Sequence, residues 1–302
     1  MYDKAAQLYG YAADNCTKDD DETMFCRIEL VKYYIRTGEL AKGDEQYNKL
    51  VTEFAENQWL ASSICFIGDT YLRAGEIDLA SLLYNKVAAT WPDDPQTIYA
   101  KAGLAKVAFY LDLDEDGYKT IDEIFIDYAD NPDIADAVYG VGDLCRSIGI
   151  YERRREVSAV NPDNSSHIPV HTGQKVKDYY AKALGVWERL IEELPDSDVT
   201  AQAYHFAAEC CGVLGEPQKE IEYFQRAADN WPNYKNAYHC QFMVGRLCEI
   251  LKRNGRMPAL EADPIINQAY RKVAQNYPDC AWAKYATKWL DSYNAREKGD
   301  LK

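Results

Sequence analysis

Residues 112–123, DLDEDGYKTIDE, have the composition of a calcium-binding loop. Such a loop needs oxygen ligands at alternating positions, a glycine that permits a sharp turn, and a final glutamate that binds through both oxygens. Gly117 stands at the glycine position, whereas Lys119 stands where an apolar residue is usual. A calcium site is therefore one hypothesis for this stretch. Its ligands would be Asp112, Asp114, Asp116 and Glu123.

Histidines form a second candidate ligand set. His205 and His239 are 34 residues apart, and Glu209 follows His205 by one helical turn. Two imidazoles and a carboxylate suit a transition metal. The preferred interpretation is that these two histidines bind no metal. The HIPVH stretch, with His167 and His171, is expected to be a plain surface loop.

Motifs of known enzyme classes are missing from the sequence. It contains no G-x-S-x-G, no H-E-x-x-H, no glycine-rich phosphate loop and no C-x-x-C pair. The ERRRE cluster at 152–156 could hold a carboxylate or a phosphate, but a solvated run of charges is the simpler interpretation. We therefore expect no catalytic residue, cofactor or structural metal.

The composition restricts the class of partner. The 302 residues are 47% hydrophobic and 27% charged, with a formal net charge of −15. This acidity argues against nucleic acid and anionic lipid and favours a neutral or basic protein. No apolar run approaches the roughly 18 residues that suggest a membrane span. Nine cysteines in no disulfide-like or zinc-like pattern are expected to be buried free thiols, which favours a reducing, cytoplasmic compartment.

A period runs along the chain. Ala55, Pro92 and Ala129 are each 37 residues apart, as are Pro195 and Pro232. Each of these residues closes a helical pattern, in pieces such as NKVAATWPDDP and QRAADNWPNY. Between two such residues the sequence predicts two amphipathic helices.

Residues 61–94 show the unit best. Gly68 in the first helix and Ala80 in the second are small and permit close approach, while Tyr84 fills the space around them. Gly75 separates the two helices. The same sizes recur at positions eight, twenty and twenty-four of each repeat counted from its first residue, although Glu220 and Ile266 at position twenty depart from the small type.

This 34-residue pattern resembles the tetratricopeptide repeat (TPR). The resemblance implies an all-α fold, an α-solenoid of helix-turn-helix repeats that forms a right-handed superhelix. We expect one solenoid over 1–302 and expect it to be a segment of a longer protein. Its expected parts are a half-repeat at 1–20, repeats at 24–57, 61–94, 98–131, 135–197 (insert 150–173), 201–234 and 238–280 (insert 252–264), and a capping helix at 281–297.

The repeat offers another explanation for residues 112–123. Gly117 falls at position twenty, and the three aspartates fall at the turn and at the start of the second helix. Acidic residues there cap backbone N–H groups and interact favourably with the helix dipole. This explanation is preferred to the calcium loop because it accounts for the whole chain.

The resemblance also implies a concave groove lined by positions two, five, nine and twelve of each first helix. Position nine alternates in sign along most of the chain, so that neighbouring first helices, about 10 Å apart, could pair their side chains. Aromatic residues flank this line and could anchor a partner. The predicted groove residues are Lys32, Asp69, Tyr99, Lys106, Phe109, Tyr139, Asp143, His205, Glu209, His239, Phe242 and Arg246.

The expected function is a non-catalytic scaffold that binds another protein or a peptide segment in this groove. Binding of a chain terminus by a carboxylate clamp is not expected, because position nine carries no asparagine. The junction YPDCAWAKYA resembles repeats of bacterial outer-membrane assembly lipoproteins and Tol-Pal coordinators. A cell-envelope structural module and a regulatory domain of a larger enzyme therefore remain alternatives, and the oligomeric state stays open.

Overall fold

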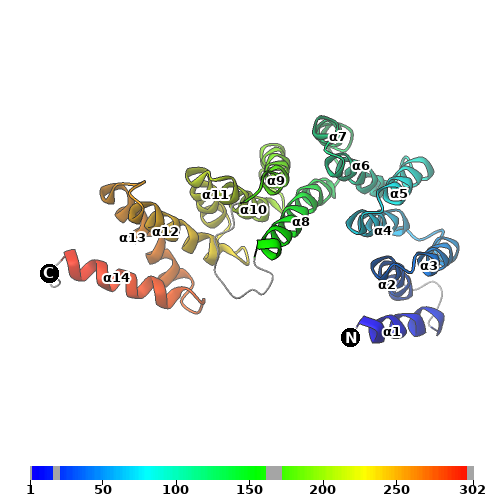
Figure 1. Ribbon diagram of the computed structural model, residues 1–302, viewed down its shortest axis with the longest axis horizontal. Helices are drawn as coiled ribbons and strands as arrows, with labels where there is room; N and C mark the ends of the chain where they lie inside the picture. Colours follow the sequence, from blue (N-terminus) through cyan, green and yellow to red (C-terminus); the bar gives the residue numbers. More distant parts are fainter. Residues whose placement is uncertain (1, 16–20, 161–171, 298–302) are drawn as a thin grey trace. The chain divides into compact units, whose positions relative to one another are not determined.

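The computed structural model describes residues 2–15, 21–160 and 172–297. These ranges contain α-helices, one short 3-10 helix and no strand (Figure 1). The predicted all-α class is therefore confirmed. The helices are α1 (Tyr2–Asn15), α2 (Asp21–Thr37), α3 (Leu40–Glu53), α4 (Leu60–Ala74), α5 (Ile77–Thr90), η1 (Pro95–Thr97), α6 (Ile98–Tyr110), α7 (Asp114–Asp127), α8 (Ile134–Val160), α9 (Gln174–Glu193), α10 (Thr200–Leu214), α11 (Pro217–Asn230), α12 (Ala237–Arg253), α13 (Ala259–Asn276) and α14 (Ala283–Glu297).

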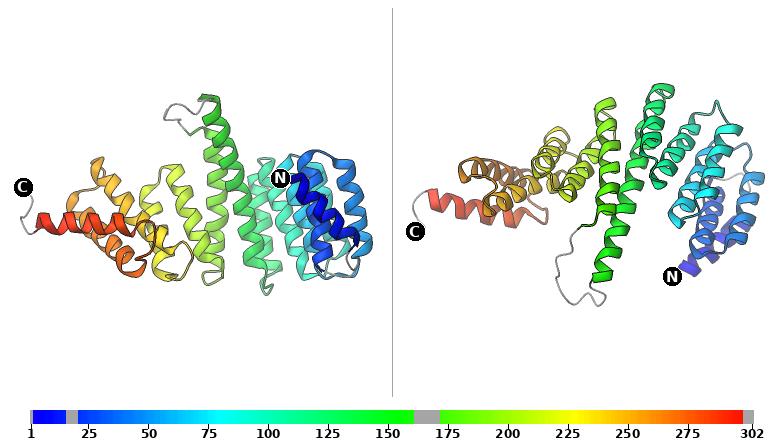
Figure 2. Two further views of the ribbon diagram at one scale, coloured as in Figure 1. Left: turned by 90° about the horizontal axis from the view of Figure 1, so that it is seen from below. Right: turned by 45° about the horizontal axis from the view of Figure 1, so that its top comes forward.

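The chain divides into two compact units, Met1–Val141 and Gly142–Lys302. Within each unit, helices that follow one another in the chain pack side by side (Figure 2). In the N-terminal unit the first helices of successive repeats also contact one another, α2 with α4 and α4 with α6. This is the helical-repeat solenoid that the 34-residue pattern predicts. None of the helices in the described ranges is long and apolar enough to cross a membrane.

The helix pairs pack through a glycine in the first helix and an aromatic ring in the second. A Cβ added at the glycine would lie within 2.7 Å of the ring atoms, so only glycine leaves the room that the ring occupies. The sequence predicts this arrangement from positions eight and twenty-four, and the structure confirms it. The pairs are Gly68 with Tyr84, Gly142 with Trp187, and Gly245 with Tyr270.

Tyr84 also joins two repeats. A Cβ at Gly103 in α6 would lie 2.3 Å from its ring, so the ring is enclosed by Gly68 of its own repeat and by Gly103 of the next one. Tyr84 is fully buried. The contact with Gly103 was not predicted, since it depends on how neighbouring repeats stack.

The helix ends follow the sequence signals. Pro92, Pro195, Pro232 and Pro278 each stand two residues after the last residue of a helix. Gly75 ends α4 with a φ of +86°, a left-handed conformation that suits glycine. The residue at the same repeat position after α6 is Asp112, whose φ is +59°. Aspartate is one of the few other residues that adopt this conformation with modest strain.

Both predicted inserts are partly helical, which corrects their boundaries. The sequence analysis starts the first insert at residue 150, but α8 continues to Val160. The stretch IYERRREVSAV contains no proline and only side chains that a helix accepts, so the helix extends as far as the described chain goes. The second insert, 252–264, includes the end of α12 and the first turns of α13. His167 and His171 lie outside the described residues.

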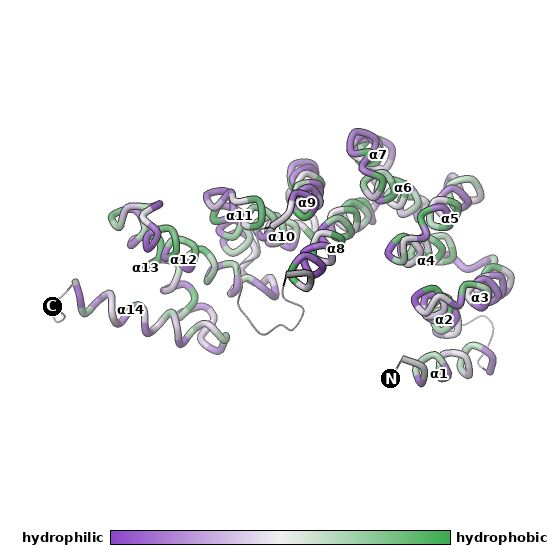
Figure 3. The backbone as a smooth tube through the Cα atoms, viewed as in Figure 1, coloured by the Kyte–Doolittle hydropathy of each residue, from purple (hydrophilic) through white to green (hydrophobic). Residues whose placement is uncertain are grey.

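Buried side chains follow the repeat. Figure 3 shows hydrophobic residues on the helix faces that meet a neighbour and hydrophilic residues on the outer side of α7. Cys145, Cys211 and Cys248 are fully buried, as predicted for the cysteines. Ile266, which replaces the small residue at position twenty, is also fully buried, so α13 packs normally there.

Candidate functional site

The line of position-nine residues forms an ion pair in the N-terminal unit. Lys106 Nζ of α6 lies 2.7 Å from Asp69 Oδ2 of α4, and the Tyr84 hydroxyl donates to Asp69 Oδ1 at 2.6 Å. Lys106 is only 7% exposed. The predicted pairing of neighbouring repeats is therefore confirmed here. The two charges compensate each other within the fold, and this buried pairing holds both side chains in place.

Other predicted groove residues of this unit differ in exposure. Lys32 pairs within its own helix with Glu29, at 2.6 Å. Tyr99 is half-buried, with its ring centroid 5.4 Å from that of Phe66, and Tyr139 is half-buried on α8. Phe109 is fully buried, so its prediction as a groove aromatic is wrong.

Phe109 is buried because of Gly117. A Cβ at Gly117 would lie 2.8 Å from the Phe109 ring, so the ring fills the space that the glycine leaves in α7. The same helix accounts for the calcium pattern. Asp114 and Asp116 belong to the first turn of α7 and Gly117 is helical, so the sharp turn of a calcium loop is not formed. Glu123 lies within 3.3 Å of Lys101 Nζ instead.

The C-terminal unit holds a network around Glu209. Arg146 donates to Glu209 Oε2 from Nη2 at 2.7 Å and from Nε at 3.2 Å. Burial opposes ionisation of Glu209, but its contacts with His205 and Arg146 outweigh burial and hold its pKa below the ordinary value. The carboxylate is therefore ionised and compensated from α8.

The two predicted histidines are neighbours. The ring centroids of His205 and His239 are 5.4 Å apart. His205 is buried and its Nδ1 lies 3.1 Å from the Tyr234 hydroxyl. Its Nε2 is 3.5 Å from Glu209 Oε1, which is too long for a well-formed hydrogen bond. In the described part of the chain no three ligand side chains are placed to hold a metal ion, so this trio does not form a metal centre.

A pocket of about 620 Å³, which we name the α10–α12 pocket, opens beside this network. Glu209, Glu220 and His239 supply polar groups, and burial followed by the charge of His205 lowers the pKa of His239. About half of the lining residues are apolar, and they come from α9, α10, α11 and α12. The remaining residues of the lining are Arg153, Thr172, Tyr180, Gly212, Val213, Phe224, Met243 and Leu247.

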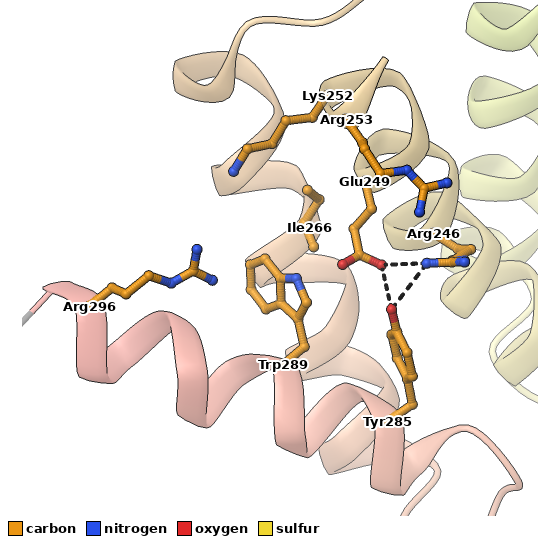
Figure 4. A pocket seen from close by; sticks show the side chains of 8 residues that line it. All are labelled: Arg246, Glu249, Lys252, Arg253, Ile266, Tyr285, Trp289 and Arg296. Carbon is orange, nitrogen blue, oxygen red and sulfur yellow. Dashed lines mark hydrogen bonds and ion pairs between the residues drawn. The ribbon is translucent and has the colours of Figure 1, made fainter. Parts of the chain in front are cut away.

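A second pocket, of about 330 Å³, lies between α12 and α14, and we name it the α12–α14 pocket (Figure 4). Glu249 is its hydrogen-bonding centre: Oε2 accepts from the Tyr270 hydroxyl at 2.7 Å and from the Tyr285 hydroxyl at 2.9 Å. Arg246 Nη1 lies 3.3 Å from the same oxygen. Arg246, predicted for the groove, pairs with Glu249 within α12 and also donates to the Tyr285 hydroxyl of α14 at 3.1 Å.

The α12–α14 pocket is positively charged. Figure 4 shows Lys252 and Arg253 entering from α12 and Arg296 reaching from α14 toward the Trp289 ring. Lys252 pairs with Asp263, whereas Arg253 and Arg296 are exposed side chains. Guanidinium groups and an aromatic ring together suit oxyanions and planar groups.

The aromatic residue predicted to flank this region is covered. Phe242 is only 5% exposed, because its ring stacks on Trp282 with centroids 4.6 Å apart. Trp282, at 39% exposure, is the ring that faces outward. Asp143, the predicted position-nine residue of α8, is half-buried.

The sequence analysis missed Arg146, Gly212 and Glu249 as site residues. All three hold position twelve of their repeats, one helical turn after position nine. The resemblance names position twelve as groove-lining, so a signal was present. Only the structure shows that the charge partner of Glu209 comes from position twelve of the preceding repeat.

The thiols of the chain are poorly suited to nucleophilic chemistry. Burial raises the pKa of Cys211 to about 12 and that of Cys248 to about 11. Burial also raises the pKa of Cys210 well above its ordinary value. Since the thiolate is the reactive form, these cysteines behave as packing residues.

Solved structures similar to this chain have low sequence identity to it. No protein-family model and no curated protein matches it. The crystal structure of MamA protein has 19% identity and a TM-score of 0.33, over 73% of this chain and 97% of that one. A tetratricopeptide repeat protein from Parabacteroides merdae has 14% identity and a TM-score of 0.29, over 88% of this chain and 98% of that one. The fold is therefore assigned from the packed helix pairs of this chain itself.

Proposed function

We propose that this protein is a non-catalytic scaffold that binds a segment of a partner protein on the first-helix face of its C-terminal unit. The observation that carries the proposal is the α10–α12 pocket, with its 620 Å³ and its mixed lining. Clefts that combine apolar walls with a few directed polar groups are the usual form of binding sites.

The two pockets of this unit favour a segment with polar and apolar side chains. On one side of α12, the α10–α12 pocket offers Phe224, Met243 and two carboxylates. On its other side, the α12–α14 pocket offers Trp289 and exposed guanidinium groups. A segment that crosses α12 would therefore meet opposite charges in turn, which supports specificity.

The N-terminal unit is less suited to binding a partner segment than the C-terminal unit. Of its two position-nine cations, Lys106 is buried against Asp69 and cannot reach a partner without breaking that pair, and Lys32 pairs with Glu29. We assign the binding role to residues 142–302 for this reason, and a structural role to Lys106 and Asp69.

The test is a selection of short random peptides on the full chain, followed by binding measurements with two variants. Leu247→Trp fills the α10–α12 pocket, whereas Leu82→Trp adds the same bulk to a residue of α5 that is 61% exposed. Selected peptides should bind Leu247→Trp about tenfold weaker or worse and Leu82→Trp with unchanged affinity. Circular dichroism spectra of both variants check that the helical fold is unchanged.

Two results would count against the proposal. Failure to enrich any peptide would remove the binding role. Equal affinity of the selected peptides for wild type and Leu247→Trp would place the binding surface elsewhere.

A further inference from the structure

Glu220 is a half-buried carboxyl group that the repeat does not call for. It stands in the first turn of α11 at position twenty, where other repeats carry Gly43, Ala80, Gly117 or Ala183. The facing residue of α10 is Gly212, and a Cβ there would lie 2.7 Å from Oε1 at the flexible end of the Glu220 side chain. The carboxyl group of Glu220 lines the α10–α12 pocket.

No cation within the described ranges pairs with this carboxyl group. Among the residues that the structure describes, no hydrogen bond or ion pair is found for the Glu220 side chain. Burial, and then the negative charge of Glu209, raise the pKa of Glu220 to about 7. A carboxylate in this setting costs free energy unless a cation or hydrogen-bond donors satisfy it.

The charges that face Glu220 do not supply the missing cation. Glu209 of α10 is compensated by Arg146, so that guanidinium is already used. His239 of α12 has a lowered pKa and is neutral near pH 7. Arg153 of α8 lines the pocket as an exposed side chain. Burial raises the pKa of the Tyr180 phenol on α9, so this group stays neutral.

The walls of the pocket suit a long cationic side chain. Phe224, Met243 and Leu247 give an apolar surface against which methylene groups can pack while the charged end reaches a carboxylate. The net charge of −15 attracts cationic segments over a distance.

We propose that the α10–α12 pocket receives a lysine or arginine side chain of the bound segment, with Glu220 as its counter-ion. This inference rests on the proposed function, because the cation belongs to the partner segment. Glu220 then sets the specificity of the site.

The direct test needs no partner. The full chain, labelled with ¹³C at glutamate carboxyl carbons, is titrated with pH in the presence of n-butylguanidinium or of the neutral n-butylurea. A ligand that binds only the ionised form lowers the pKa of the group it pairs with. The apparent pKa of Glu220 should fall by about 0.5 or more with n-butylguanidinium and stay constant with n-butylurea. Glu220→Gln identifies the signal, and exposed Glu192 is the internal control.

An unchanged Glu220 titration, or an equal change with both probes, overturns the inference even if peptides bind the pocket. Peptides from the selection give a second readout. Replacing their lysine or arginine by methionine should weaken binding to the wild type about tenfold and leave binding to Glu220→Gln unchanged. An equal loss in both proteins overturns the inference and leaves the proposed function standing.

The pH dependence has a defined sign. With a pKa of about 7, Glu220 is mostly ionised at pH 8 and mostly neutral at pH 6. A cationic peptide should therefore bind about tenfold tighter at the higher pH, and Glu220→Gln should abolish this difference. Equal pH dependence in the Glu220→Gln protein would also overturn the inference.

Discussion

Position nine has a different role in each of the two units. In the N-terminal unit Lys106 and Asp69 close the face between two first helices, and the pair is further held by the Tyr84 hydroxyl. In the C-terminal unit Glu209 is compensated by Arg146 but still lines an open pocket, next to the uncompensated Glu220. Position nine thus closes the face in one unit, whereas in the other it lines the pocket in which, in our proposal, Glu220 recognises the partner.

The largest expected effect tests how tightly the N-terminal face is closed. Gly103→Val would put a side chain into the Tyr84 ring, which lies 2.3 Å from an added Cβ. We expect a loss of about 3 kcal/mol in the free energy of unfolding, measured by urea titration.

Gly10→Val is the matched control for Gly103, since nothing lies within 4 Å of a Cβ there. It should change stability by less than about 0.5 kcal/mol. Equal stability of the two variants would show that the Tyr84 ring can move aside and that the face is not closed.

The next effect tests the ion pair itself. Lys106→Met leaves Asp69 without its cation in a largely buried place, which should cost about 2 kcal/mol. Adding Asp69→Asn removes the unpaired charge and keeps an acceptor for Tyr84, so the double variant should regain at least half of the loss. Lys49→Met, which removes the exposed pair with Glu45, should cost under about 0.5 kcal/mol. A purely additive double variant would contradict coupling between the two residues.

A smaller effect is expected at Glu220. Its folded pKa of about 7 lies above the usual 4.5, so wild type loses stability as pH rises from 4.5 to 7. Glu220→Gln lacks this loss. It should be more stable than wild type by about 1–2 kcal/mol at pH 8, after discounting for solvent screening, and equally stable at pH 4.5. A difference for Glu220→Gln that is the same at both pH values would contradict the assigned environment.

The smallest effect concerns the α12–α14 pocket. Arg253→Gln and Arg296→Gln should each change the free energy of unfolding by less than about 0.5 kcal/mol, because both side chains are exposed. This contrasts with Lys106, whose charge is buried. A loss of 2 kcal/mol or more in a thermal or urea titration would mean that these guanidinium groups stabilise the fold, as Lys106 does.

Local sequence patterns predicted the features that depend on one repeat. Gly68 and Tyr84 fixed the packing of a helix pair, and the four proline positions fixed helix ends. The neighbouring positions of His205 and His239 followed from their 34-residue separation. These inferences succeed because helical periodicity and residue size act within a short stretch.

Features that depend on contacts between different helices were not predicted from the sequence. Phe109 holds a groove-lining position, but the space left by Gly117 draws its ring into the core. The partner of Glu209 is one helical turn away from the position expected. The role of Glu220 is recognisable only with Gly212, since the glycine lies in another helix and gives no local signal.

The place of Tyr84 between two repeats has a consequence for how such a chain can be rearranged. Its ring needs glycine both in its own repeat and at the sixth position of the repeat that follows. A copied or transplanted repeat would carry the tyrosine without the second glycine. The unit that can be duplicated, deleted or exchanged is therefore not the 34-residue period but a tyrosine-bearing repeat together with the first helix of its successor.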